Sequence, residues 1–206
     1  MKAYLRAYQL DDKNHTVISE IIKLSCILID WSNLFILLPQ INYVGLNNFL
    51  VDPYQLVHLD DDPDRFVQRA KAVYQSEYER VATKSLLPSK HKKIRIGYFS
   101  ADFGLHPVSL LLVGVLEKHD RDRFEIYAYS LGKKQDSYTE RIKSAVDQFR
   151  EFNNIDDDRC LEIARADELD IAVDLMGYTK SNRMGLFSSR LAPVQVSYLG
   201  YPGTTG

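Results

Sequence analysis

The chain has 206 residues, of which 45% are hydrophobic and 26% are charged, as in globular proteins with one core or with a core and a smaller unit. The 26 basic and 28 acidic residues leave a formal net charge of −2, so the bulk charge favours neither nucleic acid nor an anionic membrane as a partner. The two cysteines lack metal-ligand spacing, and the first residues lack the apolar run of a signal peptide, so we expect a cytoplasmic protein.

The first 84 residues have a helical pattern. Apolar residues from Val17 to Leu38 are spaced alternately by four and three, which predicts one continuous helix face that Pro39 ends. A second helix is expected to begin at Asp62 and Pro63, because aspartate caps free backbone N–H groups and proline suits the first helical position. Its buried side is expected at Val67, Ala70, Tyr74, Tyr78 and Val81.

Residues 86–93 combine proline, serine and a run of charge, and the spacing of apolar residues changes after them. We therefore predict two domains, a helical segment at residues 1–84 and an α/β lobe at residues 85–206.

Strands and helices alternate in this lobe. Strands are expected at residues 94–99, 124–131, 170–175 and 194–199, and helices at 108–117, 138–146 and 156–165. In the second strand, Ile126 and Ala128 should face one side, and Tyr127 and Tyr129 the other. This order with short connections predicts a Rossmann-like, mostly parallel sheet with helices on both faces.

Three loops rich in glycine and polar groups follow strands, at residues 100–107, 176–180 and 200–206. Ligands bind at the carboxyl ends of parallel strands, so these loops should meet at one sheet edge. His106 directly precedes the helix that Pro107 opens, and the positive end of the helix dipole favours a neutral imidazole able to accept a proton. Asp102 would orient this ring or act as a second base. Alternatively, His106 only caps the helix and Asp102 only tightens the turn.

The other two loops carry less specific signals. Tyr178 and Lys180 offer a hydrogen-bonding ring and a cation, unless they belong to a solvated loop. The glycines of the last loop allow a ligand to approach the backbone, where N–H groups would hold a sugar or phosphate oxygen, although such residues also form ordinary turns.

No metal site is predicted. The five histidines have no ligand spacing with one another or with the cysteines. The aspartate runs at 60–62 and 156–158 stand at helix starts, where capping is the favoured interpretation. Phosphate-loop and dinucleotide-binding motifs are both missing from the sequence.

Three stretches of sequence resemble a known family. In order and spacing, IRIGYFSADFGLHPVS, DIAVDLMGYTKSNR and APVQVSYLGYPGTTG are similar to the N-terminal half of the catalytic region of the protein O-linked N-acetylglucosamine transferases, which include the SPINDLY-type proteins. The resemblance covers residues 94–206. It is weaker at residues 51–74, which resemble the helical segment between the tetratricopeptide repeats and the catalytic region of that family.

The resemblance implies a glycosyltransferase of the GT-B type, with two Rossmann-like lobes and a cleft between them. Members move N-acetylglucosamine from UDP-N-acetylglucosamine to serine or threonine hydroxyls of proteins, without a metal or cofactor. The implied partners are protein acceptors and a sugar nucleotide, with no nucleic acid and no membrane. The second lobe and the repeats are missing from this sequence, so we expect the fragment itself to be inactive.

Site residues follow from the same resemblance. His106 and Asp102 match residues at the catalytic face of the cleft, and the aspartate is one proposed to take part in proton removal. The acceptor side is implied for Tyr178, Lys180, Pro107 and Tyr54, and the donor side for Leu199, Gly200, Gly203 and Thr204. Tyr54 stands where animal members have a histidine often proposed as the base. Because a phenol is a poor base at neutral pH, the base lies elsewhere or Tyr54 only shapes the cleft.

Two alternatives to this function stay open. The first alternative is a non-catalytic protein-interaction remnant. The second is part of a SPINDLY-like O-fucosyltransferase that uses GDP-fucose. The residues that select the donor lie mainly in the second lobe, so this sequence does not separate the two sugars. In either case, a lobe that faces another lobe carries apolar surface, and the isolated chain is expected to self-associate.

Overall fold

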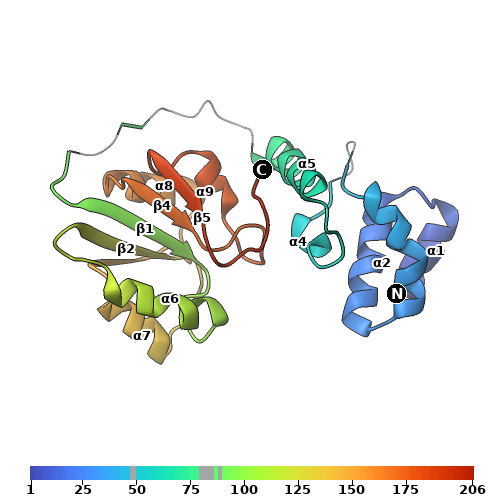
Figure 1. Ribbon diagram of the computed structural model, residues 1–206, viewed down its shortest axis with the longest axis horizontal. Helices are drawn as coiled ribbons and strands as arrows, with labels where there is room; N and C mark the ends of the chain where they lie inside the picture. Colours follow the sequence, from blue (N-terminus) through green and yellow to red (C-terminus); the bar gives the residue numbers. More distant parts are fainter. Residues whose placement is uncertain (47–49, 79–85, 88–89) are drawn as a thin grey trace. The chain divides into compact units, whose positions relative to one another are not determined.

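The computed structural model describes residues 1–46, 50–78, 86–87 and 90–206 (Figure 1). The chain forms two compact units, one of residues 1–79 with residues 203–206 and the other of residues 80–202. The domain boundary predicted between residues 84 and 85 lies outside the described residues.

The first unit is helical. Its elements are α1 (Lys2–Leu10), α2 (His15–Leu28), α3 (Trp31–Leu37), the 3-10 helix η1 (Leu38–Asn42), α4 (Pro53–Leu56), α5 (Pro63–Val73) and the π-helical turn η2 (Tyr74–Tyr78). Asp62 accepts hydrogen bonds from the backbone N–H groups of Asp64 and Arg65 at the start of α5, which confirms the predicted cap.

The prediction of one continuous helix across residues 17–38 is wrong. Helix α2 ends at Leu28, and Ile29 takes the left-handed conformation with φ 54°. The Asp30 side chain then accepts a hydrogen bond from the backbone N–H of Asn33 and starts α3. An aspartate that caps a new helix stops the old one, because its side chain replaces the carbonyl groups that would continue it.

The break changes which residues are buried. The core of this unit is formed by Ile18, Ile21, Ile22, Leu34, Leu37, Ile41, Val44, Val51 and Leu56. Trp31 and Phe35, which belong to the predicted buried stripe, are 55% and 67% exposed. The apolar spacing therefore predicts helices here correctly but misplaces their inner face.

A buried ion network fastens α5 to the rest of this unit. The Arg69 side chain is fully buried and donates hydrogen bonds to the backbone carbonyl groups of Ile41 and Val44 and to the Asp60 carboxylate. Burial raises the pKa of Asp60, but hydrogen bonds from Arg65 and Arg69 outweigh burial and lower the pKa to about 2. Asp60 is thus held as an anion against a buried cation.

The second unit is a five-stranded parallel sheet with the order β3-β2-β1-β4-β5. Its strands are β1 (Ile94–Ser100), β2 (Phe124–Ser130), β3 (Gln148–Glu151), β4 (Ile171–Asp174) and β5 (Val194–Ser197), and its helices are α6 (Pro107–Lys118), α7 (Ser137–Ser144), α8 (Asp157–Ala166) and α9 (Met184–Ser188). The four predicted strands and three predicted helices are confirmed, whereas β3 and α9 were not predicted. The predicted cap of α8 by Asp156 is also confirmed.

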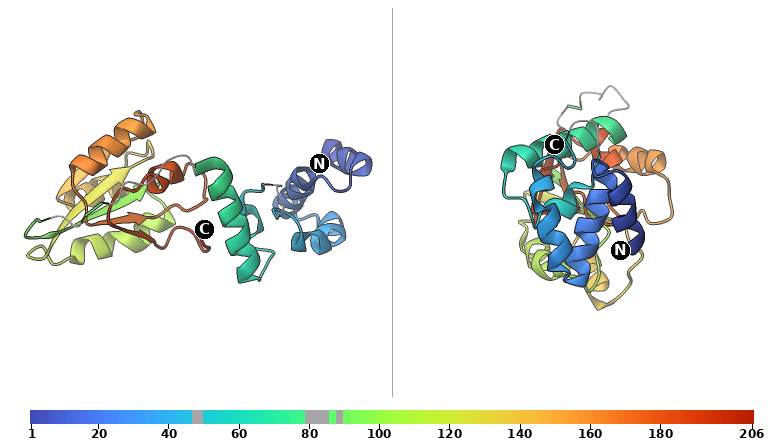
Figure 2. Two further views of the ribbon diagram at one scale, coloured as in Figure 1. Left: turned by 90° about the horizontal axis from the view of Figure 1, so that it is seen from above. Right: turned by 90° about the vertical axis from the view of Figure 1, so that its right-hand side faces the viewer.

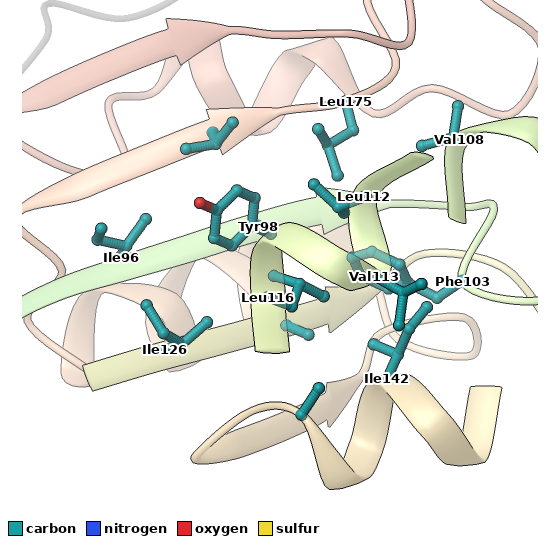
Figure 3. Packing of buried hydrophobic residues seen from close by; sticks show 13 residues of the cluster. Ile96, Tyr98, Phe103, Val108, Leu112, Val113, Leu116, Ile126, Ile142 and Leu175 are labelled. Atoms are coloured by element: carbon teal, nitrogen blue, oxygen red, sulfur yellow. The ribbon is translucent and has the colours of Figure 1, made fainter. Parts of the chain in front are cut away.

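Helices cover both faces of this sheet, as Figures 1 and 2 show for α6 and α7 on one side and α8 and α9 on the other. Ile126 and Ala128 of β2 belong to the core beneath α6 and α7, together with Leu112 and Leu116 (Figure 3). Tyr127 and Tyr129 belong to the opposite core. The predicted alternation along β2 and the Rossmann-like fold class are confirmed.

Candidate functional site

The loops that follow β1, β4 and β5 meet at one edge of the sheet. These strands are parallel neighbours, so their carboxyl ends lie side by side. Between the first two loops, the backbone N–H of Ala101 lies 3.3 Å from the Met176 sulfur, and the Ser100 hydroxyl lies 3.5 Å from the same atom. The expected meeting of these loops is therefore found.

The loops after β4 and β5 touch through glycines. A Cβ atom on Gly200 would stand 1.6 Å from the Leu175 carbonyl oxygen. Gly177 has φ +52°, and a Cβ there would stand 2.4 Å from the Tyr201 side chain. The ring of Tyr201 meets that of Tyr178 edge to face, with 5.9 Å between centroids. Only glycine fits where these two backbones come so close.

His106 caps α6 with its own side chain. The Nδ1 atom accepts a hydrogen bond from the backbone N–H of Val108 at 3.3 Å. In a neutral ring whose Nδ1 is an acceptor, the proton lies on Nε2. The capping role considered from the sequence is thus real, and the nitrogen left for a ligand is an N–H donor.

Asp102 lies beside this ring. Its Oδ2 atom is 3.7 Å from Nδ1 of His106, which is beyond hydrogen-bond length but within ion-pair range. The Asp102 backbone carbonyl accepts hydrogen bonds from the Ser109 hydroxyl at 2.6 Å and from the Gly104 N–H at 2.8 Å. Asp102 therefore tightens the turn through its backbone, which leaves its carboxylate available for chemistry.

The remaining predicted residues have varied surroundings. Pro107 occupies the first turn of α6, Tyr178 is buried, and Lys180 and Leu199 are exposed. Leu199 adopts φ 66° next to Gly200. The other three, Tyr54 in α4, Gly203 and Thr204, belong to the helical unit, where the Tyr54 ring packs edge-on to His58 at 5.6 Å.

Asp174, the last residue of β4, has a structural role that the sequence pattern does not predict. Its carboxylate is buried and accepts hydrogen bonds from the backbone N–H groups of Met176 at 2.9 Å and Gly177 at 2.8 Å. Burial raises the pKa of Asp174, although these two hydrogen bonds act in the opposite direction. The signal was present as a single aspartate at the end of an apolar strand. This side chain shapes the loop that carries Tyr178.

A cavity of about 450 Å³ lies at the opposite edge of the sheet. It is lined by residues that precede β1, β4 and β5, among them His91, Leu169 and Pro193. Within the described residues, no group of three or more His, Cys, Asp or Glu side chains is placed to hold a metal ion. In the same residues, none of the helices has the length and apolar character to cross a bilayer.

Residues 65–206 match the model of Glycosyl transferase family 41. The chain belongs to this family. A probable UDP-N-acetylglucosamine–peptide N-acetylglucosaminyltransferase of Arabidopsis thaliana, SEC, is 40% identical over 116 residues. The Arabidopsis SPINDLY protein, which carries the same probable activity in its name, is 36% identical over 124 residues. A UDP-N-acetylglucosamine–peptide N-acetylglucosaminyltransferase of Caenorhabditis elegans is 35% identical over 117 residues.

The fold also resembles a solved structure. The chain is similar to a mutant O-GlcNAc transferase of Thermobaculum terrenum with a TM-score of 0.55 and 26% identity, and the match covers 97% of this chain and 46% of that one. The matches to SEC, SPINDLY and the C. elegans enzyme cover 56%, 58% and 56% of this chain, but only 12%, 14% and 10% of those proteins. The family and the GT-B type of lobe expected from the sequence are confirmed.

Proposed function

We propose that the chain forms the acceptor side of a protein O-glycosyltransferase that moves N-acetylglucosamine from UDP-N-acetylglucosamine to serine and threonine hydroxyls. The observation that carries this proposal is the loop after β1, where His106 and Asp102 lie together at the mouth of α6, joined to the loops after β4 and β5. The names of the relatives support this donor and a protein acceptor.

In the proposed reaction, the acceptor oxygen bonds to the anomeric carbon while the bond from that carbon to the diphosphate breaks. The diphosphate leaves with the electron pair, and the hydroxyl proton passes to the Asp102 carboxylate. The Nε2–H group of His106 donates a hydrogen bond to an oxygen atom of the acceptor hydroxyl or of the leaving diphosphate. Positioning and preorganised charge supply most of the rate in such a site.

The test uses the full-length protein that contains this chain, a serine-containing peptide, and labelled UDP-N-acetylglucosamine or GDP-fucose in parallel. We expect transfer from UDP-N-acetylglucosamine, with at least a hundredfold loss in Asp102→Asn. The matched control is Asp158→Asn, which removes an exposed carboxylate in the first turn of α8. If only fucose is transferred, the donor is GDP-fucose and the proposed donor is wrong. If neither sugar is transferred, the result favours the alternative of a non-catalytic protein-interaction remnant.

We also infer that the chain is inactive on its own and that the protein acts in the cytoplasm. The 206-residue chain alone should transfer no sugar, because the family places most nucleotide-binding groups in its second lobe; incorporation by the isolated chain would contradict this.

A cytoplasmic setting is consistent with Cys26 and Cys160, which are both free thiols. Imaging of the tagged full-length protein in cells tests the location.

A further inference from the structure

A lysine that the sequence analysis did not consider lies on the other side of Asp102. The Lys134 Nζ atom is 3.6 Å from Oδ1 of Asp102, while Oδ2 of the same carboxylate is 3.7 Å from His106. Lys134 belongs to the loop between β2 and α7, which leaves the same sheet edge because β2 is the parallel neighbour of β1. The carboxylate thus lies between an ammonium group and an imidazole.

The loop that carries Lys134 is fixed to the loop after β1. The Leu131 N–H donates to the Ser100 carbonyl at 2.8 Å, the Leu105 N–H donates to the Asp136 carboxylate at 2.7 Å, and the Thr139 hydroxyl donates to the Phe103 carbonyl at 2.7 Å. These bonds span the whole length of both loops. The backbone segments that carry Lys134 and Asp102 are therefore held next to each other.

Two glycines make this close approach possible. A Cβ on Gly132 would stand 2.0 Å from the Ala101 carbonyl oxygen, so the backbones touch there. A Cβ on Gly104 would stand 2.8 Å from the Cβ of Lys134 and 3.0 Å from its Cδ. The aliphatic stem of Lys134 thus lies directly over Gly104, which leads its ammonium group to Asp102.

His106 does not donate a hydrogen bond to this carboxylate while its ring is neutral. Its Nδ1 atom accepts the hydrogen bond of Val108, so in the neutral ring it turns a lone pair, and not a proton, toward Asp102. The ammonium group of Lys134 carries the charge that a carboxylate attracts. Of the two nitrogen atoms, only that of Lys134 stabilises the ionised carboxylate while His106 caps α6.

We propose that Lys134 is a positioning residue that holds the Asp102 carboxylate in place beside His106. This inference rests on the proposed function, because it deepens the role of the same site. A mere surface ion pair would contribute little, and Lys134 is 46% exposed. A positioning residue can affect the reaction rate much more than it affects stability, because a shift of about 1 Å in a reacting group lowers rates by up to about a hundredfold.

The first experiment tests the pairing without requiring activity. In carbon-13 NMR of this chain, Lys134→Met should shift the Asp102 carboxyl resonance. Lys133→Met is the matched control, because Lys133 is exposed, adjacent and of the same charge. If both variants leave that resonance unchanged, Lys134 does not pair with Asp102 and the inference is wrong.

The second experiment measures kcat and KM in the full-length protein. Lys134→Met should lower kcat about 10- to 100-fold with little change in KM, Lys134→Arg should restore most of the rate, and Lys133→Met should match the wild type. In an Asp102→Asn background, Lys134→Met should cause no further loss, because it acts through the carboxylate. An equal loss in that background would overturn the inference. An inactive wild type with the NMR shift present would refute the proposed function alone.

Discussion

His106 serves two purposes that one substitution confounds. It caps α6 through Nδ1, and it presents Nε2–H at the sheet edge. His106→Ala should lower the free energy of unfolding by about 1 kcal/mol, the usual cost of losing a cap, whereas His106→Asn should keep the cap and the stability. Both should abolish most sugar transfer by the full-length protein. Urea unfolding followed by circular dichroism measures the first effect, and transfer assays measure the second. Full activity of His106→Asn would reduce the residue to a cap.

Asp60 makes the free energy of unfolding of the helical unit depend on pH in the acidic range. Its pKa of about 2 lies below its ordinary value of 3.8, so pairing with Arg65 and Arg69 stabilises the fold by about 2 kcal/mol above pH 4, and this contribution is lost as the pH falls through 2. Asp60→Asn should remove this acid-dependent part of the unfolding curve.

The same substitution should cost about 3–5 kcal/mol at pH 7, because it leaves the buried Arg69 without its counter-charge. Fluorescence of the chain's single tryptophan, Trp31, reports unfolding of this unit. Asp61→Asn, which alters an exposed neighbour, is the control and should change little. A loss below 1 kcal/mol in Asp60→Asn would show that Arg69 finds another partner.

At the scale of elements, the sequence predicts best where apolar spacing and helix caps agree. β1, β2 and β4 are mostly apolar segments between turn residues, and α6 and α8 begin at recognisable caps, so all five were predicted. β3 is a four-residue edge strand with the sequence QFRE, and α9 has five residues and contains a glycine, so neither has enough pattern to be recognised. β3 forms because it pairs with β2, and α9 forms because Leu186 and Phe187 pack into the core.

Two glycines of the lobe differ in the space around them, so their replacement by alanine should have opposite effects on stability. Gly200→Ala should strongly destabilise the lobe and disrupt the joined loops, because its Cβ would stand 1.6 Å from the Leu175 carbonyl oxygen, a contact that neither backbone can relieve without moving. Gly114→Ala in the middle of α6 should instead stabilise the lobe by about 0.5–1 kcal/mol, because a Cβ there meets no atom within 4 Å and alanine favours helix. Thermal unfolding of both variants measures the two signs. Equal effects of the two substitutions would contradict this assignment of close contact.

For the whole molecule, three motifs were enough to predict the family and the meeting of three loops. The fourth loop at that edge was not predicted to contribute, because the turn after β2 has no motif and Lys134 reaches Asp102 only through tertiary packing. The residue types near the strand ends can be predicted from sequence. The distances that show whether His106 or Lys134 pairs with Asp102 cannot be predicted from sequence.

The lobe has one sheet face that its described helices cover incompletely. Val194 and Val196 of β5 pair with Ile171 and Val173 of β4, so they point to the face that carries α6 and α7. Helix α7 packs near β3, the strand at the other edge of the sheet from β5, and so leaves the β5 side of this face uncovered. Val194 and Val196 consequently stay 50% and 41% exposed.

This surface should make the isolated chain self-associate. Leu111 and Val115, one helical turn apart on α6, are also exposed. Because exposed apolar side chains of this kind drive association, sedimentation velocity should show species larger than the monomer as concentration rises. The double variant Leu111→Lys with Val196→Lys should shift the distribution to monomer, whereas Leu10→Lys, at an 82% exposed position of α1, should not. A wild-type chain that stays monomeric at every concentration would mean that scattered polar groups already suffice to keep this face in water.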